Sequence, residues 1–83
     1  MKITVMLFAN LKDIAGKGSI ELELPDGASV KELKAAVSGI SEKLGEVISK
    51  GTILVALNQE MALDSDKLKD GDEVGLLPPF SGG

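Results

Sequence analysis

The first part of the chain is rich in residues that favour β-strands, and its hydrophobic side chains fall on both faces of such a strand. Residues 2–9 place Ile3, Val5 and Leu7 on one face. The other face of this segment is also largely apolar, so we expect a central strand that is covered on both sides. Residues 19–24 alternate strictly between apolar side chains and serine or glutamate, which predicts a strand with one exposed face.

The middle of the chain changes to the period of a helix. Ser29 and Glu32 have the S-x-x-E spacing of a capping box, in which both side chains satisfy backbone donors at a helix start. From there apolar residues recur every three or four positions as far as Ile40, and such a stripe packs on an apolar platform, here the sheet. Further short helical turns are expected at residues 10–15 and 44–50.

The second half of the chain predicts three more strands. Residues 52–57 are almost continuously apolar, which predicts a strand buried on both faces. Residues 61–63 form at best a short edge strand, and residues 73–77 form the last strand after a tight turn. The order of these elements predicts an α+β roll, a mixed sheet of four to five strands with one main helix packed on one face. That is the arrangement of a β-grasp, the ubiquitin-like fold.

Composition narrows the chemistry that this domain performs. A chain of 83 residues, 43% of them apolar, has room for one domain over residues 1–83 and folds with a thin stability margin. It contains no Cys, His, Trp or Tyr. Imidazole and thiol are therefore missing as nucleophiles, as zinc ligands and as ligands of haem or iron–sulfur clusters. We expect no catalytic side chains of its own and no stably bound cofactor.

Charge and hydropathy also bear on the partners and the location. The net charge is −4, all nine positive charges are lysines, and only two residues are aromatic. This argues against nucleic acid, which needs clustered positive charge and stacking aromatics, and favours a partner with a basic surface. The apolar run at residues 3–8 is too short to span a bilayer, and without a targeting segment or cysteine pairs we expect a cytoplasmic protein. The acidic residues between 64 and 72 do not fit the EF-hand template, so no metal site is predicted.

The end of the sequence has the strongest chemical signature. Residues 78–83 read Pro-Pro-Phe-Ser-Gly-Gly, which is a rigid exit from the sheet followed by a flexible tail at residues 80–83 that reaches about 13 Å when extended. Glycine lets a backbone enter a channel that any Cβ would block, and Gly83 presents the terminal carboxylate. Such a carboxylate reacts after adenylation, when a sulfur or nitrogen nucleophile attacks the anhydride. A diglycine end by itself equally fits a frayed tail, and the fold, the proline exit and the lack of competing chemistry favour a carrier.

Three segments resemble the MoaD/ThiS family of ubiquitin-like sulfur carriers, and within it the small subunits of molybdopterin synthase. Residues 70–83 are similar to the end of those subunits, where a G-D-E-V run leads into P-P-x-[ST]-G-G. Residues 8–16 resemble their F-A-x-L-R-E-x-x-G segment, and residues 55–59 resemble their V-x-V-N-Q run. Lys12 stands where arginine is usual, and Leu76-Leu77 stands where aromatics often occur. These departures bear on partner affinity more than on chemistry.

The resemblance implies a sulfur carrier for molybdenum cofactor synthesis. An activating enzyme similar to MoeB would use ATP to adenylate Gly83, and a sulfur donor protein would supply the sulfur of a thiocarboxylate. The narrow end at Gly82 and Gly83 would enter the MoaE-like large subunit. There the sulfur would pass to precursor Z, cyclic pyranopterin monophosphate, to form the dithiolene of molybdopterin. Catalytic lysines would belong to the large subunit.

Other functions remain open, namely sulfur carriage to thiamine or another product, a ubiquitin-like protein modifier, and a plain interaction module with an unreactive tail. In each case the open face of the sheet is the expected docking surface, with Phe80 as an aromatic anchor. For Phe8 and for one of the leucines, a place in the hydrophobic core is an equally good interpretation. The expected partner-binding residues are Phe8, Leu76, Pro78, Pro79, Phe80 and Ser81.

Overall fold

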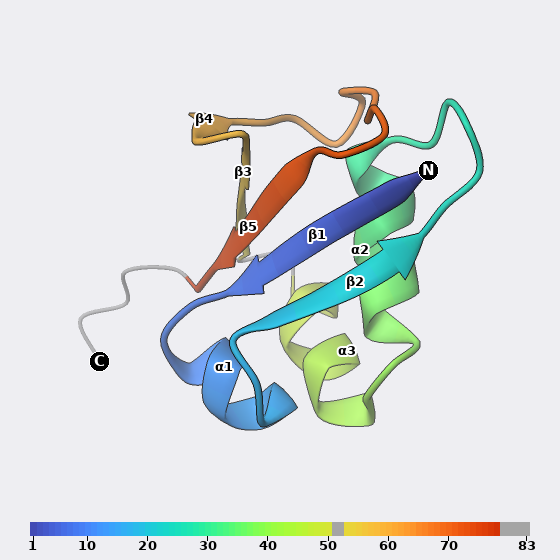
Figure 1. Ribbon diagram of the computed structural model, residues 1–83. Coiled ribbons are helices and arrows are strands. Elements are labelled where there is room, and N and C mark those ends of the chain that lie inside the picture. Colours follow the sequence, from blue (N-terminus) through green and yellow to red (C-terminus); the bar gives the residue numbers. More distant parts are fainter. Residues whose placement is uncertain (51–52, 79–83) are drawn as a thin grey trace.

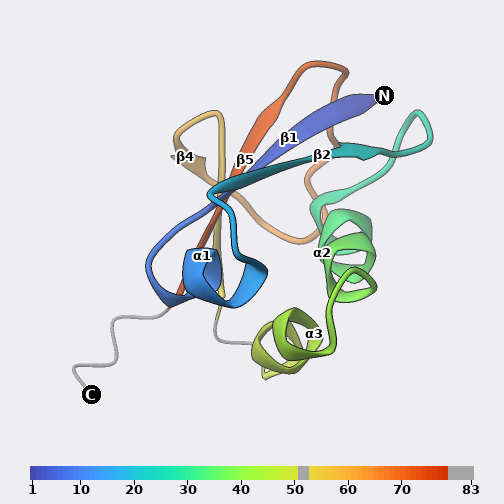
Figure 2. The same cartoon turned by 60° about the horizontal axis from the view of Figure 1, so that its bottom comes forward.

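The computed structural model describes residues 1–50 and 53–78. Within these residues a five-stranded sheet forms one layer, and three helices lie against one of its faces (Figures 1 and 2). No helix in this part of the chain is long and apolar enough to cross a membrane. In chain order the elements are β1 (Lys2–Leu7), α1 (Asn10–Ala15), β2 (Ser19–Glu23), α2 (Val30–Ser38), α3 (Glu42–Ser49), β3 (Leu54–Leu57), β4 (Glu60–Met61) and β5 (Glu73–Leu77).

The sheet is mixed, with the strand order β2-β1-β5-β3-β4. β1 pairs antiparallel with β2 and parallel with β5, and β5 pairs antiparallel with β3. The helices between the second and third strands provide the crossover that parallel pairing requires. The predicted β-grasp arrangement is confirmed. Because β5 is the central strand, the chain leaves the sheet at Pro78 from its middle, beside the end of β1 (Figure 1).

The main helix α2 begins where the sequence predicts it. The side chain of Ser29 accepts a hydrogen bond from the backbone N–H of Glu32 at 3.5 Å, and the carboxylate of Glu32 accepts one from the backbone N–H of Ser29 at 3.2 Å. Leu33 and Val37 then face the sheet with no exposed surface. The helix ends at Ser38, before Ile40, which is 49% exposed. The residues with no exposed surface at all are Ile3, Val5, Leu11, Val30, Leu33, Val37, Leu44, Val74 and Leu76.

Two predictions about strand burial are wrong. Leu54 in β3 is 44% exposed, and Thr4 and Met6 in β1 are half-buried. All three residues lie on the sheet face opposite the helices. The physical reason is that burying both faces of a strand needs a second covering layer, and the described chain places its helices on one face only.

Candidate functional site

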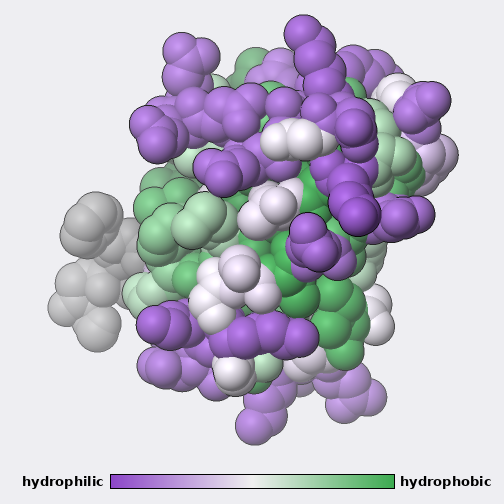
Figure 3. Space-filling model, in the orientation of Figure 1, coloured by the Kyte–Doolittle hydropathy of each residue, from purple (hydrophilic) through white to green (hydrophobic). Residues whose placement is uncertain are grey.

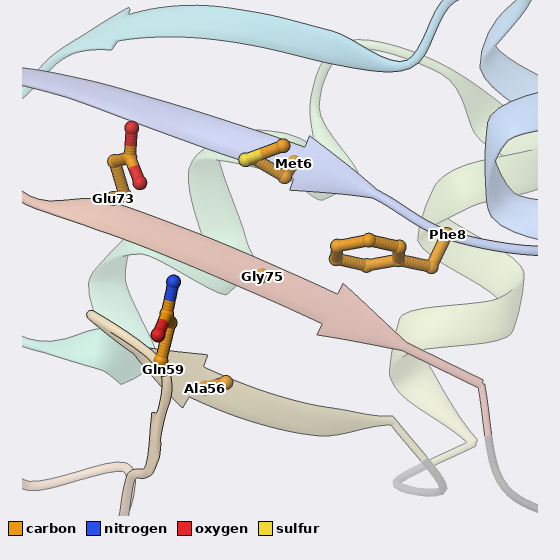
Figure 4. Close-up of a pocket in the computed structure, with 6 residues that line it drawn as sticks. All are labelled: Met6, Phe8, Ala56, Gln59, Glu73 and Gly75. Atoms are coloured by element: carbon orange, nitrogen blue, oxygen red, sulfur yellow. The ribbon is translucent and has the colours of Figure 1, made fainter.

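The face of the sheet opposite the helices carries the candidate site. The strand register places Met6, Gly75 and Ala56 in one row across β1, β5 and β3. Because the middle of this row has no side chain, the face is hollowed there, and a cavity of about 190 Å³ opens to solvent (Figure 4). This hollow, the trough, is lined by Met6, Phe8, Ala56, Gln59, Glu73 and Gly75.

The aromatic ring of Phe8 lies over Gly75 at one end of the trough (Figure 4). A Cβ atom built on Gly75 would stand 3.1 Å from Cε2 of Phe8. Carbon atoms in contact ordinarily lie about 3.5–4.0 Å apart, so with a side chain at this position the ring would have to move by a few tenths of an ångström. The ring is itself 43% exposed. Glycine at position 75 therefore allows the Phe8 ring to pack against β5, while the outer face of the ring stays open to solvent.

The turn after β1 determines where Phe8 lies. Its backbone N–H donates to the carbonyl of Leu76 at 3.3 Å, and its carbonyl accepts from the N–H of Leu11 at 3.1 Å. Between them Ala9 has φ 53° and ψ −130°, which residues with a Cβ rarely adopt, and such a conformation costs about 1–3 kcal/mol. The bond to β5 and the complete burial of Leu11 hold this strained turn in place.

The substitution Gly75→Ala is expected to displace the ring of Phe8 without unfolding the protein. The added methyl group needs the space that Cε2 occupies, and the half-exposed ring is free to swing outward. Alanine is favoured over glycine in a strand by about 0.5–1 kcal/mol, which offsets the lost contact. The NMR chemical shifts of the Phe8 ring protons should change, and the unfolding free energy in urea should change by less than about 1 kcal/mol.

The matched control is Gly18→Ala, whose Cβ would meet only the flexible side chain of Lys12, at 3.7 Å. This variant should leave the Phe8 ring where it is. An unchanged ring position in Gly75→Ala would contradict the assignment of Gly75 as the residue that makes room for the ring.

The other end of the trough is polar. Asn58 is held by two hydrogen bonds, since its Nδ2 donates to Oδ1 of Asp72 at 3.0 Å and its Oδ1 accepts from the N–H of Glu73 at 3.0 Å. These bonds fasten the turn between β3 and β4 to the start of β5. As a result Gln59, the next residue of the turn, and Glu73 lie at the same end of the trough (Figure 4). The trough thus runs from an aromatic end to an acidic end.

Acidic side chains continue across this end of the face. Glu73 pairs with Thr4 in the neighbouring strand, and Thr4 pairs with Glu21 on its other side, so both carboxylates belong to one row of the sheet. Figure 3 shows this face, with hydrophobic residues over its middle and hydrophilic residues above and below them. In the described part of the chain no group of three acidic residues is placed to hold a metal ion. The face is suited to contact with a basic protein surface.

Three of the predicted partner-binding residues lie within the described structure. Phe8 is on the open face, as predicted, and Pro78 is half-buried where β5 ends. The placement of Leu76 on that face is wrong, because its side chain has no exposed surface and packs in the core. Alternate residues of a strand face opposite sides, so Gly75 and Leu77 face outward instead. Pro79, Phe80, Ser81, Gly82 and Gly83 lie outside the described residues.

Sequence reasoning missed most of the trough. Met6 had a usable signal, since it lies two residues before Phe8 and alternation puts both on one face. Gln59 and Ala56 reach the trough because β3 pairs with β5. Glu73 reaches it because β5 pairs with β1. No local pattern in the chain specifies those pairings.

The protein has the ubiquitin-like β-grasp fold. Its sheet is mixed, its helices cover one face and leave the other open, and the chain leaves the sheet from the central strand. The sequence profile of the ThiS family matches residues 5–83. The chain therefore belongs to the ThiS family, which confirms the family that its motifs resemble.

The chain is similar to proteins from three organisms. A molybdopterin synthase sulfur carrier subunit from Chlamydomonas reinhardtii is 42% identical, with 100% of both chains covered. The crystal structure of SAMP1 from Haloferax volcanii, a small archaeal modifier protein, superposes with a TM-score of 0.88 at 29% identity and covers 100% of both chains. A chain from the complex of subunits 1 and 2 of the molybdopterin-converting factor of Helicobacter pylori superposes with a TM-score of 0.71 at 31% identity, again over 100% of both chains.

Proposed function

We propose that this chain is the sulfur carrier subunit of a molybdopterin synthase and that Gly83 carries the sulfur. The observation that carries the proposal is the match to a sulfur carrier subunit over the whole length of both chains, at 42% identity. The diglycine at residues 82–83 supports it, because a carrier of this kind needs a narrow end and a reactive carboxylate.

The proposed chemistry takes place at one carbon atom. A carboxylate oxygen of Gly83 attacks the α-phosphate of ATP in the activating enzyme, which gives an acyl adenylate and releases pyrophosphate. Sulfide released from the donor protein attacks the acyl carbon and displaces AMP, which leaves a thiocarboxylate and one proton. In the large subunit this sulfur bonds to precursor Z, and water then hydrolyses the acyl–sulfur bond, so that the sulfur stays on the acceptor and the chain end returns to a carboxylate. No side chain of the carrier takes part in bond making, in keeping with a composition that lacks imidazole and thiol.

The folded domain positions this chain end. Pro78 leaves β5 next to Phe8, so a partner that covers the open face also lies where the chain leaves the sheet. We propose the large synthase subunit and the activating enzyme as the proteins that dock here, in the cytoplasm. The Helicobacter pylori relative, solved together with its second subunit, supports the first of these partners.

Intact-mass spectrometry tests the proposal directly. After incubation with the activating enzyme, ATP and a sulfur donor, the chain should gain the mass difference between one sulfur and one oxygen atom, located at Gly83 by fragmentation. The same mixture without ATP should leave the mass unchanged. A chain that stays unmodified in the complete mixture would contradict sulfur carriage.

A second candidate function is protein modification, which the likeness to SAMP1 favours. In that case the activated carboxyl of Gly83 is joined to lysine side chains of target proteins. Digestion of a cell extract with trypsin, which cleaves after Lys69, would then yield peptides that carry residues 70–83 of this chain on a lysine and that disappear when the gene is deleted. Finding such peptides while the mass test above is negative would favour the modifier.

A further inference from the structure

The trough combines an apolar floor with the carboxylate of Glu73, and the proposed sulfur chemistry involves neither of them. Its volume, about 190 Å³, is below the roughly 300–1,000 Å³ of pockets that hold small molecules. It is suited to a single long side chain. Such a chain would pass Phe8 at the open end, cross Gly75 between Met6 and Ala56, and end beside the carboxylate of Glu73 (Figure 4).

We propose that the trough receives an arginine side chain from the docking surface of the partner protein. The guanidinium group binds the carboxylate of Glu73, and the methylene groups lie along the apolar part of the trough, beside the edge of the Phe8 ring. The identity of the partner, taken here as the large synthase subunit, rests on the proposed function. That the occupant is an arginine side chain is argued from the residues that line the trough.

The charge of the trough calls for a cation from outside the chain. Among the described residues no ion pair or side-chain hydrogen bond engages the carboxylate of Glu73, whereas its backbone N–H is bonded to Asn58. Glu21 adds a second carboxylate two strands away in the same row. The chain has a net charge of −4 and no arginine of its own. A basic partner is therefore attracted to this end of the face.

An apolar occupant does not fit this trough. It would fill the apolar part of the trough beside the Phe8 ring, but the partner surface around it would cover Glu73 and leave a carboxylate without water or a partner, which is costly. A cationic side chain pairs with the carboxylate and fills the apolar part with its methylene groups.

Arginine suits the trough better than lysine. A guanidinium group is planar and weakly hydrated, it binds a carboxylate through two parallel N–H donors, and it loses less hydration energy on burial than an ammonium group. Gln59 lies at the same end, and its amide oxygen can accept from the remaining donors once the amide group turns about its terminal bond. At the aromatic end, the half-exposed ring of Phe8 covers the base of the incoming side chain.

The main test is binding of the large synthase subunit to variants of the carrier, measured by isothermal titration calorimetry. Glu73→Gln keeps the size of the side chain and removes its charge, and we expect a dissociation constant about 10- to 100-fold higher, because a hydrogen bond between charged groups is lost. The matched control is Glu23→Gln, an exposed glutamate on the same face in the edge strand β2, opposite Lys2. It should change the dissociation constant less than about two-fold.

A double-mutant cycle identifies the occupant. Surface arginines of the large subunit are replaced by alanine one at a time and combined with Glu73→Gln, and we expect one arginine whose effect is strongly non-additive. Replacing that arginine with lysine should recover only part of the affinity. Wild-type affinity in Glu73→Gln, or the absence of any coupled arginine, would overturn the proposal.

A second titration is independent of the partner's identity. N-acetyl-arginine methylamide is added to the isolated carrier and followed by NMR, with N-acetyl-citrulline methylamide as the uncharged control. Saturable shifts at the amides of Ala56, Gln59 and Gly75 are expected with the arginine compound only, and they should be absent in Glu73→Gln. Equal shifts with citrulline, or none with arginine, would refute an arginine trough even if sulfur carriage is normal. Failure of the large subunit to bind the wild type would instead contradict the proposed function.

Discussion

Deletion of Gly83 is expected to abolish sulfur transfer and to leave the domain folded. The truncated chain ends at Gly82, so its carboxylate is displaced by about 3.5 Å from the position where the activating enzyme and the large subunit act. Misplacement of a reacting atom by about 1 Å already costs roughly 100-fold in rate. The expected result is therefore no detectable thiocarboxylate and no detectable conversion of precursor Z, measured in single-turnover assays.

Folding of the truncated chain is checked separately by urea unfolding. The described core residues run from Ile3 to Leu76, well before the deleted position, so the unfolding free energy should match that of the full chain. If the truncated protein unfolded at a lower urea concentration than the full chain, the loss of activity would be due to instability. A folded truncated protein that still supports cofactor synthesis would contradict the proposed function.

The substitution Leu76→Ala should cause the largest loss of stability among the residues first expected to bind partners. Leu76 has no exposed surface and packs among the core residues between β5 and the helices. Truncating a buried leucine to alanine costs about 2–5 kcal/mol, because transfer energy is lost and a cavity remains. A domain of 83 residues has only about 4–12 kcal/mol in total. The variant should therefore unfold at a much lower urea concentration.

The control for this prediction is Leu77→Ala, on the opposite face of the same strand. Leu77 is half-buried, so its truncation removes less apolar contact and should cost less than half as much stability. If Leu76→Ala instead kept full stability and weakened the binding of the large subunit, Leu76 would belong to the docking surface after all.

The local elements of this fold were predictable, because each depends on neighbours in the sequence. The Ser29–Glu32 capping box needs only its own spacing, and it defined the start of α2 correctly. Strict alternation likewise identified β2. The first strand was placed correctly, and alternation put Phe8 on the face opposite Ile3, although that face was expected to be covered and is open in the structure.

The features that were missed depend on contacts between distant segments. In the last strand Val74, Leu76 and Leu77 are all apolar, so alternation alone does not decide which of the two leucines faces the core. The pairing of Leu76 with Val55 and Leu7, both buried, decides it. The role of Gly75 has the same origin, because the ring above it comes from a residue 67 positions earlier, Phe8.

Pairing of β5 on both of its sides also has a mechanical consequence. When a partner draws on the chain beyond Pro78, the force acts along β5, and the hydrogen bonds to β1 and β3 lie across that direction. Bonds loaded in shear resist together, whereas bonds peeled from an end break one after another. Under the proposed function, tension applied to the chain beyond Pro78 would therefore be borne by the hydrogen bonds of β5 to both of its neighbours together.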